Sequence, residues 1–519
     1  MKKAWRVGSG LMAWIGVLAW MGLAGGLGAC GGDDDEVLTI SPPGPVVVEK
    51  GSTQQFTANF AGVTWSVEGG DANGTINVNG LYTPPATLPI DPEVTVVASL
   101  PGAEDSALVE LRTADSIAFP PATEAVQVNQ DPADPSVLFE TLILAGIGDR
   151  LAVNLGSIHV NAVWNGGSSE PSIFFGHSLD FGPFSPELNI SPAGTSQLAA
   201  VLENDGDHNP MLALVELPPE PTATPTATPV TQVLFTRSEN QGASFTAPVA
   251  VAPSTLFQGN PSMRRDENGV IHLVYGQSEE LSEGVLGSIF YVQSADNGAT
   301  WSSPIPVVPP PTAPAVLGFP YIAVDPEGQV LHVCFATFPD SSSLDDSFIT
   351  SVKSVDGGDS FGEPVDLEAT SGVADLLCRN ALGSNGEVYI GWSRDVGDIA
   401  QVLFSVSTDG GSSFSSPKRI SSVANSSEAF AMLSVDSLGR LDVVWTGDPT
   451  GGTDFADLIY VRSTDAGQTF SDNATLAQGV EAMVPLGLRH DVSGRTHVIF
   501  ASDINDPGNS VDILYLLGE

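Results

Sequence analysis

The segment Ser294-Ala295-Asp296-Asn297-Gly298-Ala299-Thr300-Trp301 decides the fold, because its pattern recurs through the second half of the chain. Four copies of the pattern Ser-x-Asp-x-Gly-x-x-aromatic are complete: Ser294/Asp296/Gly298/Trp301, Ser354/Asp356/Gly358/Phe361, Ser407/Asp409/Gly411/Phe414 and Ser463/Asp465/Gly467/Phe470. Two more copies depart from it: Ser238/Asn240/Gly242/Phe245 carries one changed residue, and Ser178/Asp180/Gly182 is degenerate at its end. Successive serines lie 53 to 60 residues apart. A repeat of this period is typical of a solenoid or a propeller.

The chemistry of the repeated motif is that of a turn. Asp and Ser side chains hydrogen-bond backbone N–H groups two residues on, and Gly adopts positive φ without a steric penalty. The aromatic residue is expected to anchor the turn on the sheet. Because the motif offers neither a nucleophile nor a complete metal shell, we predict no catalytic residue among its positions.

Each repeat also shows a fixed order of strands. An apolar first strand leads into Asp-x-x-Gly, an alternating second strand follows, and a third strand runs into the Ser-x-Asp turn before a fourth. This order predicts four-stranded antiparallel blades. First strands are expected near 150–156, 197–204, 260–267, 319–325, 376–382, 428–436 and 482–491.

The last repeat stops after its third strand, Ile513-Leu514-Tyr515-Leu516. Its fourth strand is therefore expected from the segment between Ser116 and Ala145, which would close a ring of seven blades. Six blades with a decorated first unit remain the alternative.

The motif and its place between third and fourth strands resemble the Asp-box, or bacterial neuraminidase repeat, of sialidase-like propellers. The resemblance covers 114–519 and implies an all-β propeller. It implies no activity, because the motif also occurs in unrelated hydrolases and in plain binding proteins.

Residues 37–113 carry a different pattern of short strand-like runs separated by Gly, Pro and Asn, as in a β-sandwich. Val63-Thr64-Trp65-Ser66-Val67, Gly74-Thr75-Ile76 and Gly80-Leu81-Tyr82-Thr83-Pro84-Pro85 resemble bacterial immunoglobulin-like domains. Trp65 is expected to fill the core. The resemblance implies a spacer.

The first 29 residues have the pattern of a secretory signal: a basic start, an apolar run and the segment Leu27-Gly28-Ala29-Cys30. This end resembles the lipobox of bacterial lipoproteins, which implies that Cys30 is lipidated. A plain secretory signal or an uncleaved anchor is the alternative. Residues 30–36 form an acidic tether. The expected location is the bacterial cell envelope, at the outer membrane, on its periplasmic or its outer face.

The chain is strongly acidic, with 62 Asp and Glu against 18 Lys and Arg and a formal net charge of −44. Such a charge repels phosphate backbones, so nucleic acid is not an expected partner. Cys334 and Cys378 lie on apolar strands of neighbouring repeats; an oxidising compartment would permit a disulfide, but free buried thiols are expected.

Sialidases hold the substrate carboxylate with three arginines and use a tyrosine–glutamate pair and an aspartate. The first arginine of the family has no counterpart here. Both kinds of turn, Asp-x-x-Gly and Ser-x-Asp, are expected on one face, named the lower face. The upper face holds the connections between second and third strands; its candidate site residues are Tyr321, beside the channel, and Arg394.

The upper connections carry carboxylates: Glu279, Glu280, Glu283, Asp340, Asp345, Asp346, Asp395, Asp398, Asp448, Asp454, Asp457, Asp503 and Asp506. This charge disfavours an anionic sugar and suits Ca²⁺, a neutral polysaccharide or a basic protein patch, or serves only solvation. Asp205–Asn209 and Asp503–Asp506 have oxygen ligands at alternate positions, as calcium loops do, but turn chemistry explains them as well.

Three functions follow as hypotheses, of which the third is a structural component of the cell envelope with no soluble ligand. The first is an envelope-anchored, non-catalytic propeller that binds glycan or protein, with no cofactor beyond a possible Ca²⁺. The alternative is an exo-acting glycoside hydrolase of sialidase type, for which three arginines and a Tyr–Glu pair should converge at the channel.

Overall fold

The protein is all-β in a computed structural model, as the sequence predicts. The structure describes residues 37–129, 151–153, 159–166, 171–217, 230–279, 287–308, 316–339, 345–396, 399–420, 428–448, 457–478, 483–502 and 512–519. Within these ranges the only helices are two short 3₁₀ turns, η1 (Gly70–Asn73) and η2 (Ala122–Glu124). None of the described segments forms an apolar helix of membrane-spanning length.

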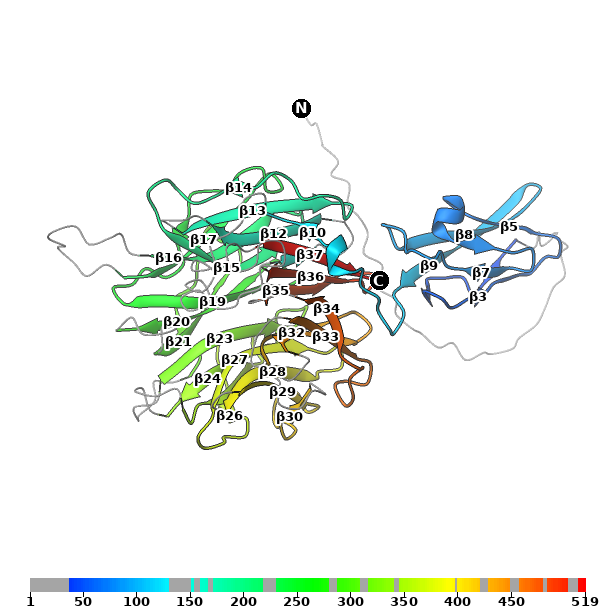
Figure 1. Cartoon of the computed structure of the whole chain (residues 1–519). Coiled ribbons are helices and arrows are strands. Elements are labelled where there is room, and N and C mark those ends of the chain that lie inside the picture. Colours follow the sequence, from blue (N-terminus) through cyan, green and yellow to red (C-terminus); the bar gives the residue numbers. More distant parts are fainter. Residues whose placement is uncertain are drawn as a thin grey trace, which may run out of the picture.

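The N-terminal part consists of small sheets around its own core (Figure 1). Its largest sheet has the order β2 (Val46–Glu49), β9 (Ala103–Arg112), β8 (Glu93–Leu100), β5 (Thr64–Val67). The others pair β3 (Gln54–Gln55), β7 (Leu81–Thr83) and β6 (Thr75–Ile76), and β1 (Ile40–Ser41) with β4 (Thr57–Ala58). Trp65 is only partly buried against this core, whereas Phe56 and Tyr82 are fully buried. Trp65 therefore packs against the core from the inward face of β5, whereas Thr64 and Ser66 face solvent, and it does not fill the centre of the core.

The rest of the described chain forms seven four-stranded antiparallel sheets, which we number I to VII. Sheets I to III contain β11 (Leu151–Val153), β12 (His159–Gly166), β13 (Ser172–Leu179), β14 (Leu188–Asn189); β15 (Gln197–Asn204), β16 (Pro210–Glu216), β17 (Gln232–Arg237), β18 (Val249–Ala250); β19 (Phe257–Arg265), β20 (Ile271–Ser278), β21 (Ser288–Ser294), β22 (Ile305–Pro306).

Sheets IV to VI contain β23 (Val316–Val324), β24 (Leu331–Phe338), β25 (Phe348–Ser354), β26 (Val365–Asp366); β27 (Ala374–Leu382), β28 (Val388–Val396), β29 (Ile399–Ser407), β30 (Lys418–Arg419); β31 (Glu428–Val435), β32 (Leu441–Gly447), β33 (Asp457–Ser463), β34 (Ala474–Gln478). Sheet VII combines β35 (Met483–His490), β36 (Thr496–Ser502) and β37 (Asp512–Gly518) with β10 (Val126–Gln127).

The first strands of the seven sheets contact one another in a closed ring. Each of β11, β15, β19, β23, β27, β31 and β35 packs against the next, and β35 returns to β11. The inner edges of the sheets therefore surround a common axis, and side chains from all parts of the chain can meet there.

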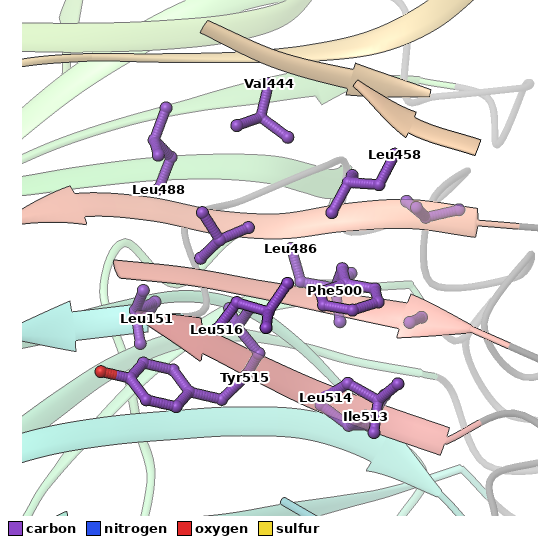
Figure 2. Packing of buried hydrophobic residues seen from close by; sticks show 14 of the residues in the cluster. Leu151, Val444, Leu458, Leu486, Leu488, Phe500, Ile513, Leu514, Tyr515 and Leu516 are labelled. Atoms are coloured by element: carbon purple, nitrogen blue, oxygen red, sulfur yellow. The ribbon is translucent and has the colours of Figure 1, made fainter. Parts of the chain in front are cut away.

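Sheet VII joins both ends of this region, as the sequence predicts. Its outer strand β10 comes from before sheet I and pairs antiparallel with β37, Val126 opposite Tyr515. Cyan β10 and red β37 lie side by side in Figure 1. Figure 2 shows the core behind this junction, where Leu151 of β11 and Leu458 of β33 flank Leu486, Phe500 and Leu516 of sheet VII. These fully buried apolar side chains hold the first and last sheets together.

The Ser-x-Asp-x-Gly motif closes a turn through its own side chains. In the first complete copy, Ser294 Oγ accepts the N–H of Gly298 at 2.8 Å and donates to Asp296 Oδ1 at 2.8 Å. Asp296 also accepts from the backbone N–H (2.8 Å) and the hydroxyl (2.6 Å) of Thr300. These bonds, led by that from the Thr300 hydroxyl, lower the pKa of Asp296 to about 2.

The copy with one changed residue keeps this turn. Ser238 Oγ accepts the N–H of Gly242 at 2.8 Å and donates to Asn240 Oδ1 at 2.9 Å. Asn240 Oδ1 also accepts the N–H of Ser244 at 2.8 Å. The amide oxygen of Asn240 therefore replaces one carboxylate oxygen of the usual aspartate, without the negative charge.

The degenerate copy does not form the expected turn. Ser178 Oγ donates to the carbonyl of Gly182 and does not accept its N–H, which instead donates to the carbonyl of Leu179 at 2.9 Å. Asp180 is exposed and itself adopts positive φ, 54°. The positive-φ residues, Asp180 and Phe181, thus come one residue earlier than in the complete copies, and this moves the Asp180 carboxylate out of the capping position.

The motif also joins neighbouring sheets, which the sequence did not reveal. The ring of Trp301 packs edge-on against Phe235 of β17 in the preceding sheet, at 5.3 Å between centroids. Gly298 has φ +81° and presses against the same Phe235 ring. The glycine therefore supplies both positive φ and the close approach of two sheets.

Three other copies of the motif make the same contact between sheets. Each glycine has positive φ and presses on a ring of the preceding sheet: Gly242 on Phe175, Gly358 on Tyr291 and Gly467 on Phe404. The aromatic residues of these copies face the same rings, in the pairs Phe245–Phe175, Phe361–Tyr291 and Phe470–Phe404.

Phe414 is the exception among the complete copies. The residue of sheet IV that corresponds to Phe235 is Ser351, three positions before the motif serine, so it offers no ring to Phe414. Phe414 is instead half-buried against the apolar cluster of sheets IV and V. Gly411 of this copy lies against the imidazole of His332. The aromatic residue anchors the turn here as expected, but on aliphatic and other apolar neighbours.

Cys334 of β24 and Cys378 of β27 form a disulfide between sheets IV and V, with 6.3 Å between their Cα atoms. The expectation of free thiols is wrong, because the ring brings the second strand of one sheet against the first strand of the next. This proximity of the two backbones is not visible in the sequence.

The two adjacent glycines of one motif separate the cost of backbone strain from the cost of crowding. Gly410 (φ +67°) has open space where a Cβ would lie, whereas a Cβ on Gly411 (φ +79°) would overlap the imidazole of His332. We expect Gly410→Ala to lower the free energy of unfolding by about 1–2 kcal/mol through strain alone. Gly411→Ala should cost about 1–3 kcal/mol more, because the neighbouring sheet must move.

Urea titration of both variants and the wild type measures the difference. Equal losses for Gly410→Ala and Gly411→Ala would show that the motif does not hold the sheets together.

Candidate functional site at the channel

Three charged side chains occupy the same position in three first strands. Glu203, Arg264 and Arg489 each stand two residues before the aspartate that begins the turn after the strand. Because alternate residues of a strand share a face, this common position places them in one layer around the axis. None of the three was singled out in the sequence.

Glu203 links the other two members of this layer. Its Oε1 lies 3.3 Å from Arg264 Nη1 and 3.1 Å from Arg489 Nη2. The three side chains are 16–18% exposed. The carboxylate thus joins sheets II, III and VII, and it orients two guanidinium groups at a partly solvated opening.

Tyr321 lies between two guanidinium groups next to this layer. The Cζ atoms of Arg264 and Arg379 are 4.9 and 4.5 Å from the centre of its ring. Arg264 Nη2 also donates to the Tyr321 hydroxyl. We name Glu203, Arg264, Tyr321, Arg379 and Arg489 the channel cluster. It brings three cations and one anion together in a chain with a net charge of −44.

Tyr321 and Arg379 each follow a backbone bulge in their own strand. The pairing of β23 with β24 shifts between Gly318 and Tyr321, and that of β27 with β28 shifts between Leu376 and Arg379. The bulged residues Phe319 and Leu377 have positive φ, 54° and 57°. A bulge changes the direction of the side chains that follow it, so these irregularities set how Tyr321 and Arg379 lie.

The cluster adjoins a cavity of about 960 Å³ on the lower face. Arg264 and Arg489 line it together with His332, Lys353 and the turns that follow β23, β27, β31 and β35. Arg112, the last residue of β9 in the N-terminal part, also lines it. The volume is in the range of small-ligand sites.

Comparison with known proteins gives a fold rather than a family. No protein-family model matches the chain, and no curated protein matches it in sequence. The ulvan lyase of polysaccharide lyase family PL25, solved bound to -[GlcA(1-4)Rha3S]-, is similar over 75% of this chain and 95% of its own. The two share 11% identity with a TM-score of 0.53. The chain has a β-propeller fold.

Two other solved structures are similar at lower TM-scores. A Hadza microbial sialidase matches 67% of this chain and 74% of its own, with 12% identity and a TM-score of 0.42. An α-L-arabinofuranosidase of Fusarium graminearum matches 60% and 91%, with 14% identity and a TM-score of 0.42. At such identities the likeness concerns the fold only.

The propeller separates the two residues predicted for an upper-face site. Tyr321 is buried in the channel cluster, with 3% of its surface exposed. Arg394, near the end of β28, forms two hydrogen bonds of 2.7 Å to the buried carboxylate of Asp375. This pairing raises the pKa of Arg394 and gives the side chain a structural partner.

Much of the predicted acidic rim lies outside the described residues, as does the segment Asp503–Asp506. The other suspected calcium loop is a hydrogen-bonded turn: Asp205 Oδ1 accepts the N–H groups of Asp207 and Asn209, both at 2.8 Å. Within the described part of the chain, no three His, Cys, Asp or Glu side chains are grouped to hold a metal ion.

The arginines of the cluster could have been found by aligning the repeats on their turn aspartates. This alignment places Arg264 and Arg489 at one position and Glu203 at the same position in the second repeat. Arg379 gives no such signal, because it stands four positions before Gly383, which replaces the aspartate, and so shares the position of Tyr321 rather than that of Arg264.

His332 should make the propeller sensitive to acid. Burial, with a contribution from the charge of Lys353, lowers the pKa of this cavity-lining imidazole from 6.5 to about 4. Since the folded state binds this proton less tightly than the unfolded state, stability is complete above pH 6.5 and is lost as the pH falls toward 4. The shift lowers the free energy of unfolding by about 3 kcal/mol at the acid end of this pH range.

The variant His332→Phe keeps a ring against Gly411 and removes the titrating group. Unfolding free energies measured at pH 7 and pH 4.5 should therefore differ less in His332→Phe than in the wild type. Other buried histidines contribute to both proteins and cancel in this comparison. An identical loss of stability in the two proteins would contradict the assignment.

Proposed function

We propose that this protein binds an acidic polysaccharide at the channel cluster, as a non-catalytic propeller anchored to the bacterial cell envelope. The observation that carries the proposal is the convergence of Arg264 and Arg379 on Tyr321, with Arg489 joined to Arg264 through Glu203, in a strongly acidic chain. With Glu203 counted, the cluster has a net charge of +2. Guanidinium groups suit carboxylate and sulfate, because their planar N–H pairs match two oxygens at once.

The position of the cluster strengthens its electrostatic effect. Its charges are partly buried, where interactions are screened less than at an open surface. The acidic remainder of the protein would repel an anionic chain, so the cationic opening would fix where such a chain binds. Tyr321 adds a ring that stiffens the two guanidinium groups stacked on it.

The comparison gives indirect support. The ulvan lyase with a similar fold was solved with a saccharide that contains GlcA and Rha3S, that is, a carboxylate and a sulfate. We propose the same chemical class of ligand for this protein, without transferring the reaction.

We also propose that sheets I to VII are seven blades of one propeller and that 37–113 is an immunoglobulin-like domain. The closed ring of first strands and the pairing of β10 with β37 support seven blades over six. The sheet of β2, β9, β8 and β5 against smaller sheets supports the immunoglobulin-like assignment.

A glycan-cleaving enzyme of sialidase type is the second candidate, because three arginines, a tyrosine and a glutamate do converge. A tyrosine nucleophile, however, needs a carboxylate partner. Among the described contacts, the Tyr321 hydroxyl accepts a hydrogen bond from Arg264, and Glu203 pairs with Arg264 and Arg489. These contacts favour binding over cleavage.

Titration calorimetry with oligosaccharides of the repeat -[GlcA(1-4)Rha3S]- tests the proposal. We expect binding to the full-length protein, and none of a neutral oligosaccharide of equal length. Arg264→Ala and Arg489→Ala should each weaken binding at least about tenfold, since a partly buried charge contact is lost. Arg237→Ala is the matched control, because Arg237 pairs with Glu239 outside the cavity.

Unchanged affinity in both Arg264→Ala and Arg489→Ala would refute the proposed site. Shorter oligosaccharides appearing in the wild-type sample, and not with Tyr321→Phe, would support the enzyme instead.

The anchor has its own test. We propose that Cys30 carries lipid and that residues 30–36 tether the folded part to the membrane, where two or three acyl chains provide stable affinity. Cys30→Ser should move the protein from the membrane fraction to the soluble or secreted fraction. Recovery of Cys30→Ser entirely with membranes, measured by fractionation and immunoblotting, would contradict lipidation.

A further inference from the structure

We infer that the N-terminal domain is one wall of the polysaccharide site and that its Arg112 contacts the bound chain beside the channel cluster. This inference rests on the proposed function. It replaces the view of residues 37–113 as a spacer, and it names a longer acidic oligosaccharide, rather than a single acidic sugar, as the ligand.

The domain is docked on the lower face through its last residues. The N–H of Thr113 donates to the carbonyl of Ser493 at 2.9 Å, and its hydroxyl donates to the carbonyl of Gly494 at 2.9 Å. Thr113 is fully buried. The residue directly after Arg112 is therefore fixed to the turn that follows β35.

Three buried arginines of the propeller strengthen this docking. Arg440 donates to the carbonyls of Thr113 and Ala114 at 2.8 and 2.9 Å, and Arg462 donates to Ala114 at 3.3 Å. Arg495 donates to the carbonyl of Leu88 at 3.0 Å and to that of Pro89. These charged donors are buried, so releasing the domain would leave them without these acceptors. The N-terminal domain is thus held in one orientation.

Docking brings Arg112 to the cavity that Arg264 and Arg489 line. Its side chain is 14% exposed, and it forms an ion pair of 3.0 Å with Glu110. Its Nε is buried and has no hydrogen-bond partner among the described residues. Among the described residues, Leu111 and Glu110 accept one N–H each from Nη1 and Nη2, so a guanidinium group with five N–H donors keeps terminal donors for a ligand.

Glu110 is the carboxylate that pairs with Arg112, and Asp325, Glu327, Asp436 and Asp491 also line the cavity. Asp436 pairs with Arg440 at 2.6 Å, and Asp491 pairs with Arg495 at 3.1 Å. The wall therefore adds the guanidinium group of Arg112, in an ion pair with Glu110, to those of Arg264 and Arg489. Guanidinium groups at two positions of one cavity suit a chain with anionic groups on more than one sugar.

The experiment compares two ligands: methyl glucuronide, which has one carboxylate, and a tetrasaccharide of the repeat -[GlcA(1-4)Rha3S]-. Arg112→Gln should weaken binding of the tetrasaccharide by about tenfold and leave methyl glucuronide unchanged. Arg264→Ala should weaken binding of both ligands. Lys50→Gln is the matched control, because Lys50 pairs with Glu519 at 3.6 Å at the same junction and does not line the cavity.

The outcomes separate the two claims. Wild-type affinity in Arg112→Gln, with the loss still seen in Arg264→Ala, would make the N-terminal domain a spacer and leave the proposed function intact. No loss in Arg264→Ala and Arg489→Ala would remove the proposed function itself. Should Arg112→Gln unfold in thermal denaturation, Arg112→Lys, which keeps the charge, must bind the tetrasaccharide within a few-fold of the wild-type affinity. If a folded Arg112→Lys loses affinity for methyl glucuronide as well as for the tetrasaccharide, the inference is overturned.

Discussion

The contact of a motif glycine with a ring of the preceding sheet is the constraint on which the rest of the structure depends. Ser294, Ser354, Ser407 and Ser463 each accept the N–H of a glycine four residues on, at 2.8–2.9 Å. The bond holds the turn in the conformation that lets the glycine reach a neighbouring ring. Without this close approach the sheets would splay, the ring of first strands would open, and the residues at the axis would not meet.

The distribution of the few cations follows from the acidity of the chain. With only 18 Lys and Arg, the described propeller uses several arginines to neutralise buried carboxylates. Asp442 is the clearest case: it accepts from Arg462 at 2.7 and 2.8 Å, from Thr496 at 2.6 Å and lies 2.8 Å from His490 Nε2. These partners hold the pKa of Asp442 below its usual range despite complete burial. The channel cluster differs, because among its described residues one carboxylate, Glu203, lies with three arginines.

The proposed binding site lies on the lower face of the propeller, the face that also holds the structural turns. Both kinds of turn were expected on the lower face, and the candidate site residues on the upper face. The lower face also contains the cavity, the exposed edge of the channel cluster and the docked N-terminal domain. Arg440 and Arg495, which flank lower turns in the sequence, turn out to hold that domain rather than a ligand.

The sequence by itself determined the all-β class, the repeat, the position of the strands and the origin of the strand that completes sheet VII. These features are local: alternation, turn chemistry and a fixed period are written in neighbouring residues. Only the tertiary structure decided that Cys334 meets Cys378, that Trp301 packs on Phe235, and that Glu203, Arg264, Tyr321, Arg379 and Arg489 share one opening. Those contacts join residues tens to hundreds of positions apart, and closure of a ring, which no local pattern encodes, is what brings them within reach.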